Sequence, residues 1–155
     1  MKKVIMILAA ALCMSLAASA QPKAIGIRGL FNLAQISYEH TLGGANFLEA
    51  DLGGTNYGGH FGFDVTGTYN FMLVQPAWTA GTWGVYAGPG VTLGQYSFTE
   101  NDATKTEFYF GIVGQVGLEY TFNIPLQLAA DLRPVFGIGG YGVRFFPTIA
   151  CRYAF

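Results

Sequence analysis

The sequence has little charge and only two cysteines, Cys13 and Cys151. Charged residues make up 11% of its 155 residues, whereas a soluble domain usually carries about a quarter. Hydrophobic residues make up 52%, which excludes an intrinsically disordered chain because disorder requires low hydrophobicity. The formal net charge of −1 offers no basic surface, so we expect no nucleic-acid partner. A chain of this length forms one domain, and its low charge raises the question of which solvent that domain faces.

The N-terminus predicts a secretory signal peptide over residues 1–20. Lys2 and Lys3 precede an apolar run over residues 4–16, and residues 18–20 read Ala-Ser-Ala, a small-residue cleavage site. A membrane anchor helix is the alternative, but the apolar run is short for one. We therefore expect a mature domain over residues 21–155. That domain keeps a single cysteine, so no internal disulfide can stabilise it.

Apolar and polar residues alternate with period two through the rest of the chain. Residues 65–99 carry no charge, but glycine and proline are too frequent there for a membrane helix. Alternation predicts β-strands, and it recurs in eight segments: residues 25–31, 35–39, 48–52, 61–71, 83–93, 108–120, 126–133 and 143–155. Turn-forming residues separate them at seven breaks: residues 32–34, 43–46, 53–59, 74–81, 97–106, 123–125 and 137–142.

The polar face is rich in glycine, whereas the apolar face carries bulky aromatic and aliphatic side chains. Gly84, Gly88, Gly90 and Gly94 lie on the polar face of one segment. A solvated surface has no use for these glycines, but the crowded lumen of a small barrel does. The apolar face reads as a lipid-facing wall. Strands in lipid must close on themselves to satisfy their backbone groups, so we expect an all-β fold, an eight-stranded antiparallel up-and-down transmembrane β-barrel.

The chain end carries the most specific motif. Residues 148–155, Thr-Ile-Ala-Cys-Arg-Tyr-Ala-Phe, resemble the C-terminal assembly signal of bacterial outer-membrane barrels, with Tyr153 and Phe155 at its key positions and Ala150 where glycine is usual. With residues 24–29, 36–40, 117–122 and 130–134, the chain resembles small eight-stranded outer-membrane proteins of the OmpX/OmpA-barrel kind, especially short versions common in Bacteroidota. This resemblance implies an outer-membrane location, contact with lipid and lipopolysaccharide, and insertion by the barrel-assembly machinery. It implies no single activity.

The inward face would carry the charged residues. We expect them to form salt bridges that plug the lumen, since buried charges must be paired; they are Arg28, Glu39, Glu49, Asp51, Asp64, Glu119, Asp131, Arg133, Arg144 and Arg152. A proton or ion path is the alternative reading. A divalent cation on Glu49, Asp51 and Asp64 is a weaker one, because calcium needs six or more oxygens.

The expected function is a structural or surface-interaction role through the extracellular loops, for a ligand that the sequence does not name. The longest connection, residues 97–106, would face outside. We expect no catalytic, cofactor-binding or metal-binding residues. Two alternatives stay open, a small-molecule or lipid carrier and a lipid A-modifying enzyme, for which His60 would be the base.

Overall fold

The computed structural model describes residues 22–42, 45–57, 60–100, 103–138 and 142–155. Residues 1–20, the expected signal peptide, lie outside the described residues. Within the described ranges the chain forms nine strands: β1 (Pro22–Leu30), β2 (Leu33–Thr41), β3 (Phe47–Tyr57), β4 (His60–Val74), β5 (Ala77–Trp78), β6 (Gly81–Glu100), β7 (Ala103–Phe122), β8 (Gln127–Ile138) and β9 (Gly142–Ala154). This part of the chain contains no helix long and apolar enough to cross a bilayer.

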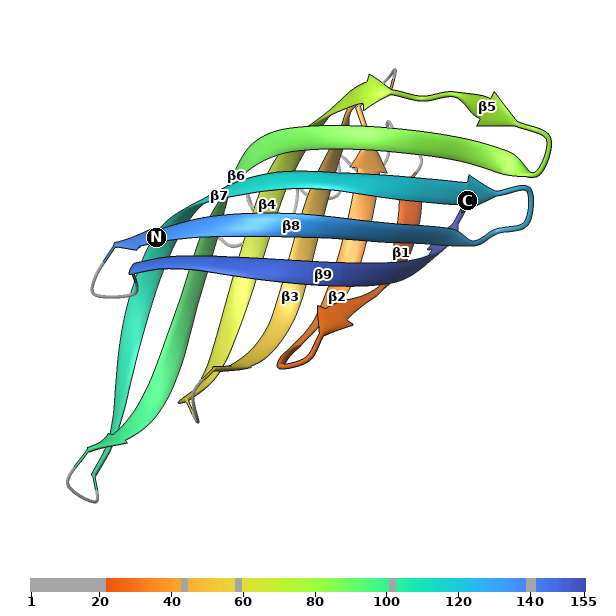
Figure 1. Cartoon of the computed structure of the whole chain (residues 1–155). Helices are drawn as coiled ribbons and strands as arrows, with labels where there is room; N and C mark the ends of the chain where they lie inside the picture. Colours follow the sequence, from red (N-terminus) through yellow and green to blue (C-terminus); the bar gives the residue numbers. More distant parts are fainter. Residues whose placement is uncertain (1–21, 43–44, 58–59, 101–102, 139–141) are drawn as a thin grey trace, which may run out of the picture.

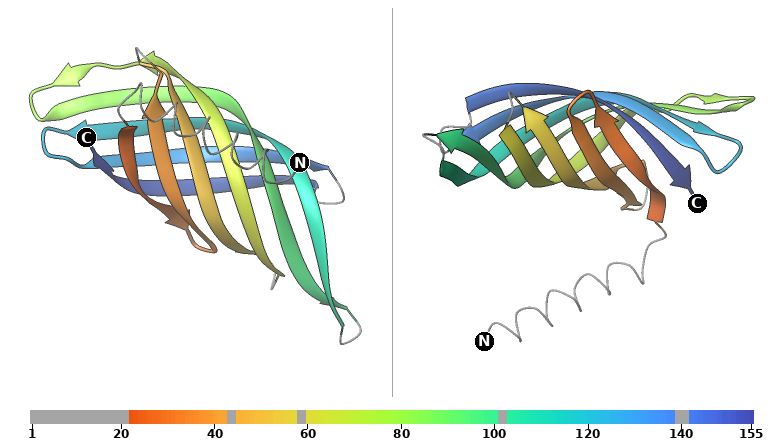
Figure 2. Two further views of the ribbon diagram at one scale, coloured as in Figure 1. Left: turned by 180° about the vertical axis from the view of Figure 1, so that it is seen from behind. Right: turned by 90° about the horizontal axis from the view of Figure 1, so that it is seen from below.

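Eight of these strands close into an antiparallel barrel (Figures 1 and 2). Strands that follow one another in the chain lie side by side, and two further pairings close the cylinder. β1 pairs with β9, with Ile27 opposite Cys151, and β4 pairs with β6, with Val65 opposite Leu93. β5 is a two-residue strand that pairs only with the start of β6. The predicted eight-stranded, up-and-down barrel is therefore confirmed.

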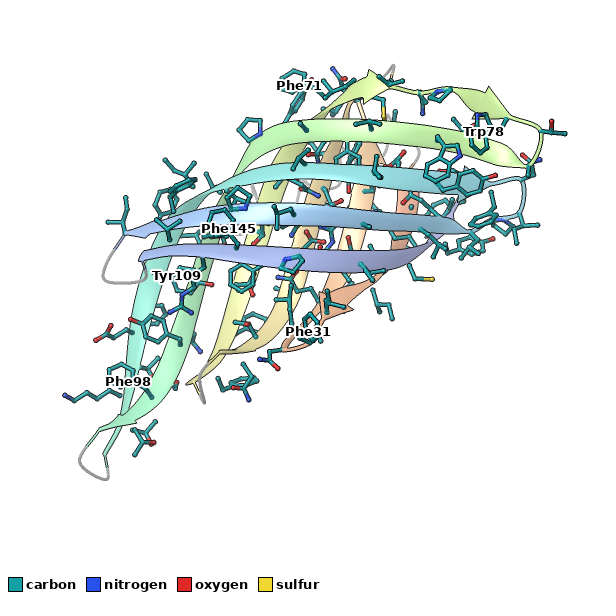
Figure 3. All side chains as sticks on the ribbon, viewed as in Figure 1. Phe31, Phe71, Trp78, Phe98, Tyr109 and Phe145 are labelled. Carbon is teal, nitrogen blue, oxygen red and sulfur yellow. The ribbon has the colours of Figure 1, made fainter. Side chains whose placement is uncertain are left out.

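Polar side chains point into the barrel and apolar side chains point out. In β8, for example, Asp131 and Arg133 are 7% and 4% exposed, whereas Leu132 between them is 40% exposed. The same alternation follows from the pleat of a strand, which sends successive side chains to opposite faces. The burial pattern repeats it along the other long strands, apart from a small inward-facing apolar cluster at Tyr109, Val113 and Val135; Figure 3 shows the side chains on the strands. The lumen, not the outer surface, is the polar part of this molecule.

The two ends of the barrel differ. At the end we call the termini end, the C-terminal strand β9 pairs with the start of β1, with Ala154 opposite Ala24. At the opposite end, the hairpin end, β6 and β7 continue well beyond their neighbours (Figure 1). Phe98 lies near the tip of this β6–β7 hairpin (Figure 3).

Several predicted connections were wrong in extent. The break over residues 97–106 is mostly strand, since β6 and β7 pair from Ser97 opposite Thr106 to Glu100 opposite Ala103. Threonine and aromatic residues there favour a strand. The turn was predicted from the polar composition of this segment, which does not distinguish a turn from an exposed strand. β3 likewise runs through the predicted break at residues 53–59 as far as Tyr57. The break at residues 74–81 contains the additional strand β5.

Glycines on the inner wall make room for long side chains from the strands beside and across the lumen. A Cβ atom on Gly117 would lie 2.6 Å from the Cβ atom of Asp131 and 2.7 Å from the ring of Tyr86. A Cβ atom on Gly94 would lie 2.6 Å from the ring of Tyr109, and one on Gly84 would lie 2.8 Å from Glu119. These glycines therefore serve packing inside the barrel, as expected of a narrow lumen.

Candidate functional site: the polar lumen

Glu49 of β3 is the centre of the lumen network. Its fully buried carboxylate forms ion pairs with Arg28 at 2.7 Å and with Arg152 at 2.6 Å. It also pairs with Arg133 and accepts a hydrogen bond from Gln115 Nε2 at 3.2 Å. Three guanidinium groups from β1, β8 and β9 thus converge on one carboxylate. Such charge-assisted contacts are the strong class of hydrogen bonds, and they connect strands on different sides of the barrel.

Asp131 and Asp51 bind the same arginines from other directions. Asp131 accepts hydrogen bonds from Arg28 at 3.0 Å, from the Thr148 hydroxyl at 2.7 Å and from the Tyr86 hydroxyl at 3.1 Å. Asp51 lies 2.6 Å from Arg133. Arg28 and Arg133 therefore each have a second carboxylate besides Glu49. The centre of the lumen is filled by this arrangement, because the large side chains of Arg28, Arg152 and Tyr86 are fully buried in it.

Arg152 extends the network toward the termini end. Its guanidinium pairs with Glu39 at 3.2 Å and donates to Gln127 Oε1 at 3.0 Å and to the Ser37 hydroxyl at 3.0 Å. Gln127 donates in turn to Glu119 at 3.3 Å. Glu119 is thereby linked to the same network through one neutral residue.

Asp64 forms a separate polar group toward the hairpin end. Its carboxylate accepts from Gln35 Nε2 at 2.7 Å and from the Thr66 hydroxyl at 3.1 Å, and the Thr66 and Thr92 hydroxyls are in hydrogen-bond contact at 2.9 Å. Beside this group lies a cavity of about 30 Å³. A small apolar cluster of Tyr109, Val113 and Val135 forms another part of its wall.

The buried charges of the described lumen do not balance. Three arginines (Arg28, Arg133 and Arg152) face six carboxylates (Glu39, Glu49, Asp51, Asp64, Glu119 and Asp131), all at most 7% exposed. Ionised carboxylates removed from water require a counter-charge or a proton. Four of the carboxylates, Glu39, Glu49, Asp51 and Asp131, share the three arginines. Glu119 is linked to them through Gln127, whereas the hydrogen bonds of Asp64 come from the neutral groups of Gln35 and Thr66.

The structure brings together most of the charged residues that the sequence placed inside. Asp64 lies in its own polar group, and Arg144 lies half-buried nearer the hairpin end of β9, opposite Val135. Glu49 and Asp51, which were considered with Asp64 as ligands of a divalent cation, form ion pairs with arginines instead. The described residues contain no group of three or more metal-ligating side chains of the histidine, cysteine or acidic kind.

The sequence reasoning left out the neutral members of the network. Gln35, Gln115, Gln127 and Tyr86 are buried and donate hydrogen bonds to the charged groups. The signal that could have found them is their even spacing on the same polar face as the charged residues. Near the termini end, His40 Nδ1 forms a hydrogen bond of 2.9 Å with the Tyr38 hydroxyl. The side chain of His60 lies outside what the structure describes.

Aromatic side chains gather at the termini end. Ring centroids lie 5.5 Å apart between Trp78 and Trp83, 5.0 Å between Trp83 and Tyr120, and 4.6 Å between Tyr120 and Phe122. Tyr153 and Phe155, the expected assembly signal, lie at the same end with centroids 5.7 Å apart, and each is 57% exposed on the outer wall. Such a belt is typical of the level at which a barrel meets lipid headgroups.

Comparison with known proteins identifies the architecture. No family model matches the sequence, and no curated protein matches it. Among solved structures, the chain is similar to the N-terminal β-barrel domain of Pseudomonas aeruginosa OprF, with a TM-score of 0.70. The fold is that of this barrel. The match covers 86% of this chain and 96% of that domain at 16% sequence identity, so the two share a fold and little sequence.

Proposed function

We propose that this protein is an integral β-barrel of the bacterial outer membrane with a filled lumen and a structural or surface-interaction role. The observation that carries the proposal is the apolar outer wall. Ile27, Phe108 and Ile149 are 69%, 77% and 52% exposed, and similar residues point outward from every long strand. A soluble monomer rarely exposes apolar patches beyond a few hundred Å². Lipid in place of water around the barrel makes this wall favourable.

The polarity of the lumen argues against a soluble carrier. A carrier of the lipocalin kind encloses an apolar ligand in an apolar interior. Here the centre of the interior holds Arg28, Glu49 and Asp131 in direct contact. A large apolar ligand has no room beside them.

The two ends support one orientation. In a barrel with an even number of strands, both termini lie on one side, which for bacterial outer-membrane barrels is the periplasm. The aromatic belt and the terminal residues Tyr153 and Phe155 would then lie at the periplasmic interface, where the barrel-assembly machinery would bind them. Residues 1–20 would be removed as a signal peptide on export. The β6–β7 hairpin would project outside, among lipopolysaccharide.

The hairpin is the part of the chain best placed for a surface interaction. Its outer part projects past β4, which pairs with β6 only as far as Phe61 opposite Ser97. At the base of this part the Ser97 and Thr106 hydroxyls are in hydrogen-bond contact at 3.0 Å, and Tyr96 donates to Glu107 at 2.6 Å. A variant that lacks residues 97–106 should insert normally and lose binding to envelope or cell-surface components. Equal binding by this variant and the parent would contradict a role for the hairpin.

Membrane insertion can be tested with Cys151, which is exposed on the outer wall of β9. In vesicles, lipid should shield its thiol from a charged maleimide, whereas detergent-free unfolded protein should react. A matched control places the only cysteine of residues 21–155 on the hairpin, with Thr104→Cys in a Cys151→Ser background. Thr104 is exposed, so this variant should react in vesicles. Rapid reaction of Cys151 in vesicles would contradict a lipid-facing wall, as would unheated and heated samples that migrate alike on gels.

The filled lumen predicts an absence of channel activity. Because Arg28, Arg152 and Tyr86 occupy its centre, planar bilayers containing the protein should show no large, stable conductance. Stable openings would contradict a plugged barrel. A non-enzymatic role fits this arrangement, since every described charged group near the centre is bound to another protein group.

A further inference from the structure

Two buried oxygen atoms at the hairpin end of the lumen have no hydrogen-bond partner among the described residues. Gln35 uses its Nε2 atom to donate to Asp64 Oδ2, which leaves Gln35 Oε1 without a donor, and Asp64 Oδ1 has none either. Both residues are 5% exposed. They line the cavity of about 30 Å³ described above, here called the lumen cavity. Buried acceptors left unpaired are unfavourable, so this pair marks a place for a donor.

The charge of the site favours a cation as that donor. No arginine of the described residues pairs with Asp64, whose two hydrogen bonds come from Gln35 and Thr66. Arg133 also lines the lumen cavity, but Glu49 and Asp51 hold its guanidinium. Since the lumen buries six carboxylates and three arginines, one more positive charge near Asp64 reduces the imbalance. A buried carboxylate requires such a partner or a proton.

The residues that line the lumen cavity favour an organic cation over a metal ion. Calcium binds six or more oxygens, whereas the lumen cavity offers one carboxylate, one amide oxygen and the hydroxyls of threonines. The remaining wall consists of Tyr109, Val113, Val135 and other apolar residues. An ammonium group has several N–H donors for the oxygens, and an attached hydrocarbon matches the apolar side.

A second cavity provides space for that hydrocarbon. It has a volume of about 260 Å³, is lined by Leu30, Phe31, Phe145 and Pro147 among others, and is here called the side cavity. It shares Leu33, Thr55 and Phe146 with the lumen cavity, so the two adjoin.

The side cavity lies where the wall of the barrel is incomplete. β1 and β9 pair only as far as Gly29 opposite Ile149, because β1 ends at Leu30. Beyond that point β9 continues through Pro147 without a β1 partner. Proline has no N–H group to leave unsatisfied at this free edge.

We infer that these two cavities bind a small amphiphilic amine. Its ammonium group donates to Asp64 Oδ1 and Gln35 Oε1 in the lumen cavity, and its apolar body lies between Phe146, Leu33 and the side cavity. The site borders the arginine network at Arg133, whose guanidinium is held by Glu49 and Asp51.

The test uses the purified full chain in detergent micelles, with the methyl groups of Val113 and Val135 observed by NMR. Both residues line the lumen cavity. The probe is n-hexylammonium, compared with hexan-1-ol and n-hexyltrimethylammonium, which have the same body but lack the charge or the N–H donors. We expect saturable shifts with hexylammonium at millimolar concentrations and much smaller shifts with the other two compounds. Equal shifts with hexan-1-ol, or none with hexylammonium, would overturn the inference.

Two variants and a control assign the binding to the site. Asp64→Asn keeps the shape but removes the charge, and should weaken hexylammonium binding by about tenfold or more. Leu33→Trp should obstruct the junction of the cavities and weaken binding with Asp64 intact. Glu107→Gln removes a charge from the exposed hairpin and should leave affinity unchanged. Folding of each variant is checked by heat-modifiable gel mobility. Unchanged affinity in folded Asp64→Asn protein would refute the role of its carboxylate.

An ethanolamine lipid headgroup carries the same ammonium group. Nanodiscs of phosphatidylethanolamine and of phosphatidylcholine, without added amine, separate the two sources. We expect the Val113 and Val135 methyl signals to match in both lipids. A lipid headgroup bound with its ammonium at Asp64 would place its charged phosphate in the apolar side cavity, which is unfavourable. Shifts confined to phosphatidylethanolamine would overturn the free amine as the ligand and assign the site to lipid.

Discussion

Neutralising Glu49 should destabilise the barrel more than any other change of one charge in the lumen. In Glu49→Gln the side chain keeps its size but no longer carries the charge that binds Arg28, Arg133 and Arg152. Hydrogen bonds to charged groups contribute about 1.5–3 kcal/mol each. Breaking a buried ion pair by removing one partner costs about 3–5 kcal/mol.

The remaining carboxylates limit the loss. Arg28 keeps Asp131 at 3.0 Å, and Arg152 keeps Glu39 at 3.2 Å. Arg133 keeps Asp51, whose repulsion from Glu49 is also relieved. We therefore expect the free energy of unfolding to fall by about 3–5 kcal/mol, the cost of one buried pair and not of three.

The measurement is equilibrium unfolding in urea with the protein in phospholipid vesicles, followed by the fluorescence of Trp78 and Trp83 and by unheated gel mobility. Glu107→Gln is the matched control, because Glu107 is exposed and bonds to Tyr96 outside the lumen. Its unfolding midpoint should equal that of the parent. If Glu49→Gln also unfolds at the parent midpoint, the arginines do not depend on Glu49 and the reasoning from the network is wrong.

Three other predictions test packing, backbone strain and screening. Gly117→Ala should destabilise the barrel by about 1–3 kcal/mol, because its Cβ atom would overlap Tyr86. Gly67→Ala, with no atom within 4 Å of the added Cβ, should unfold at the urea midpoint of the parent. Equal midpoints for Gly117→Ala and Gly67→Ala would contradict this packing argument. Phe31 has a left-handed φ of 53°, so Phe31→Asn should raise the free energy of unfolding by about 1 kcal/mol; a lower midpoint would show that the ring contributes more than the strain. Raising ionic strength should change the unfolding midpoint little, since buried pairs are poorly screened; a marked fall would indicate that water reaches the network.

Much of the fold followed from local pattern. Alternation with period two identified the strands and told inward from outward residues, because a strand sends successive side chains to opposite faces whatever its partners are. The residues at which the strands end were harder to predict from the sequence. Ser97, Thr99 and Thr106 looked like a polar connection, but each pairs with a residue across the β6–β7 hairpin. Whether such residues form strand or turn depends on the pairing partner, which the local sequence does not contain.

The amino-acid sequence by itself determined the polarity of the wall and the set of charged residues inside it. Only the tertiary structure decided which of them meet. Arg28 and Asp131 are 103 residues apart in the chain and bond across the closed barrel, and Glu49 meets Arg152 over the same separation of 103 residues. The register of all the strands sets these contacts. The same register gives Asp64 the neutral partners Gln35 and Thr66 and leaves the lumen cavity beside it, because a residue's neighbours across the lumen depend on the pairing of every strand between them.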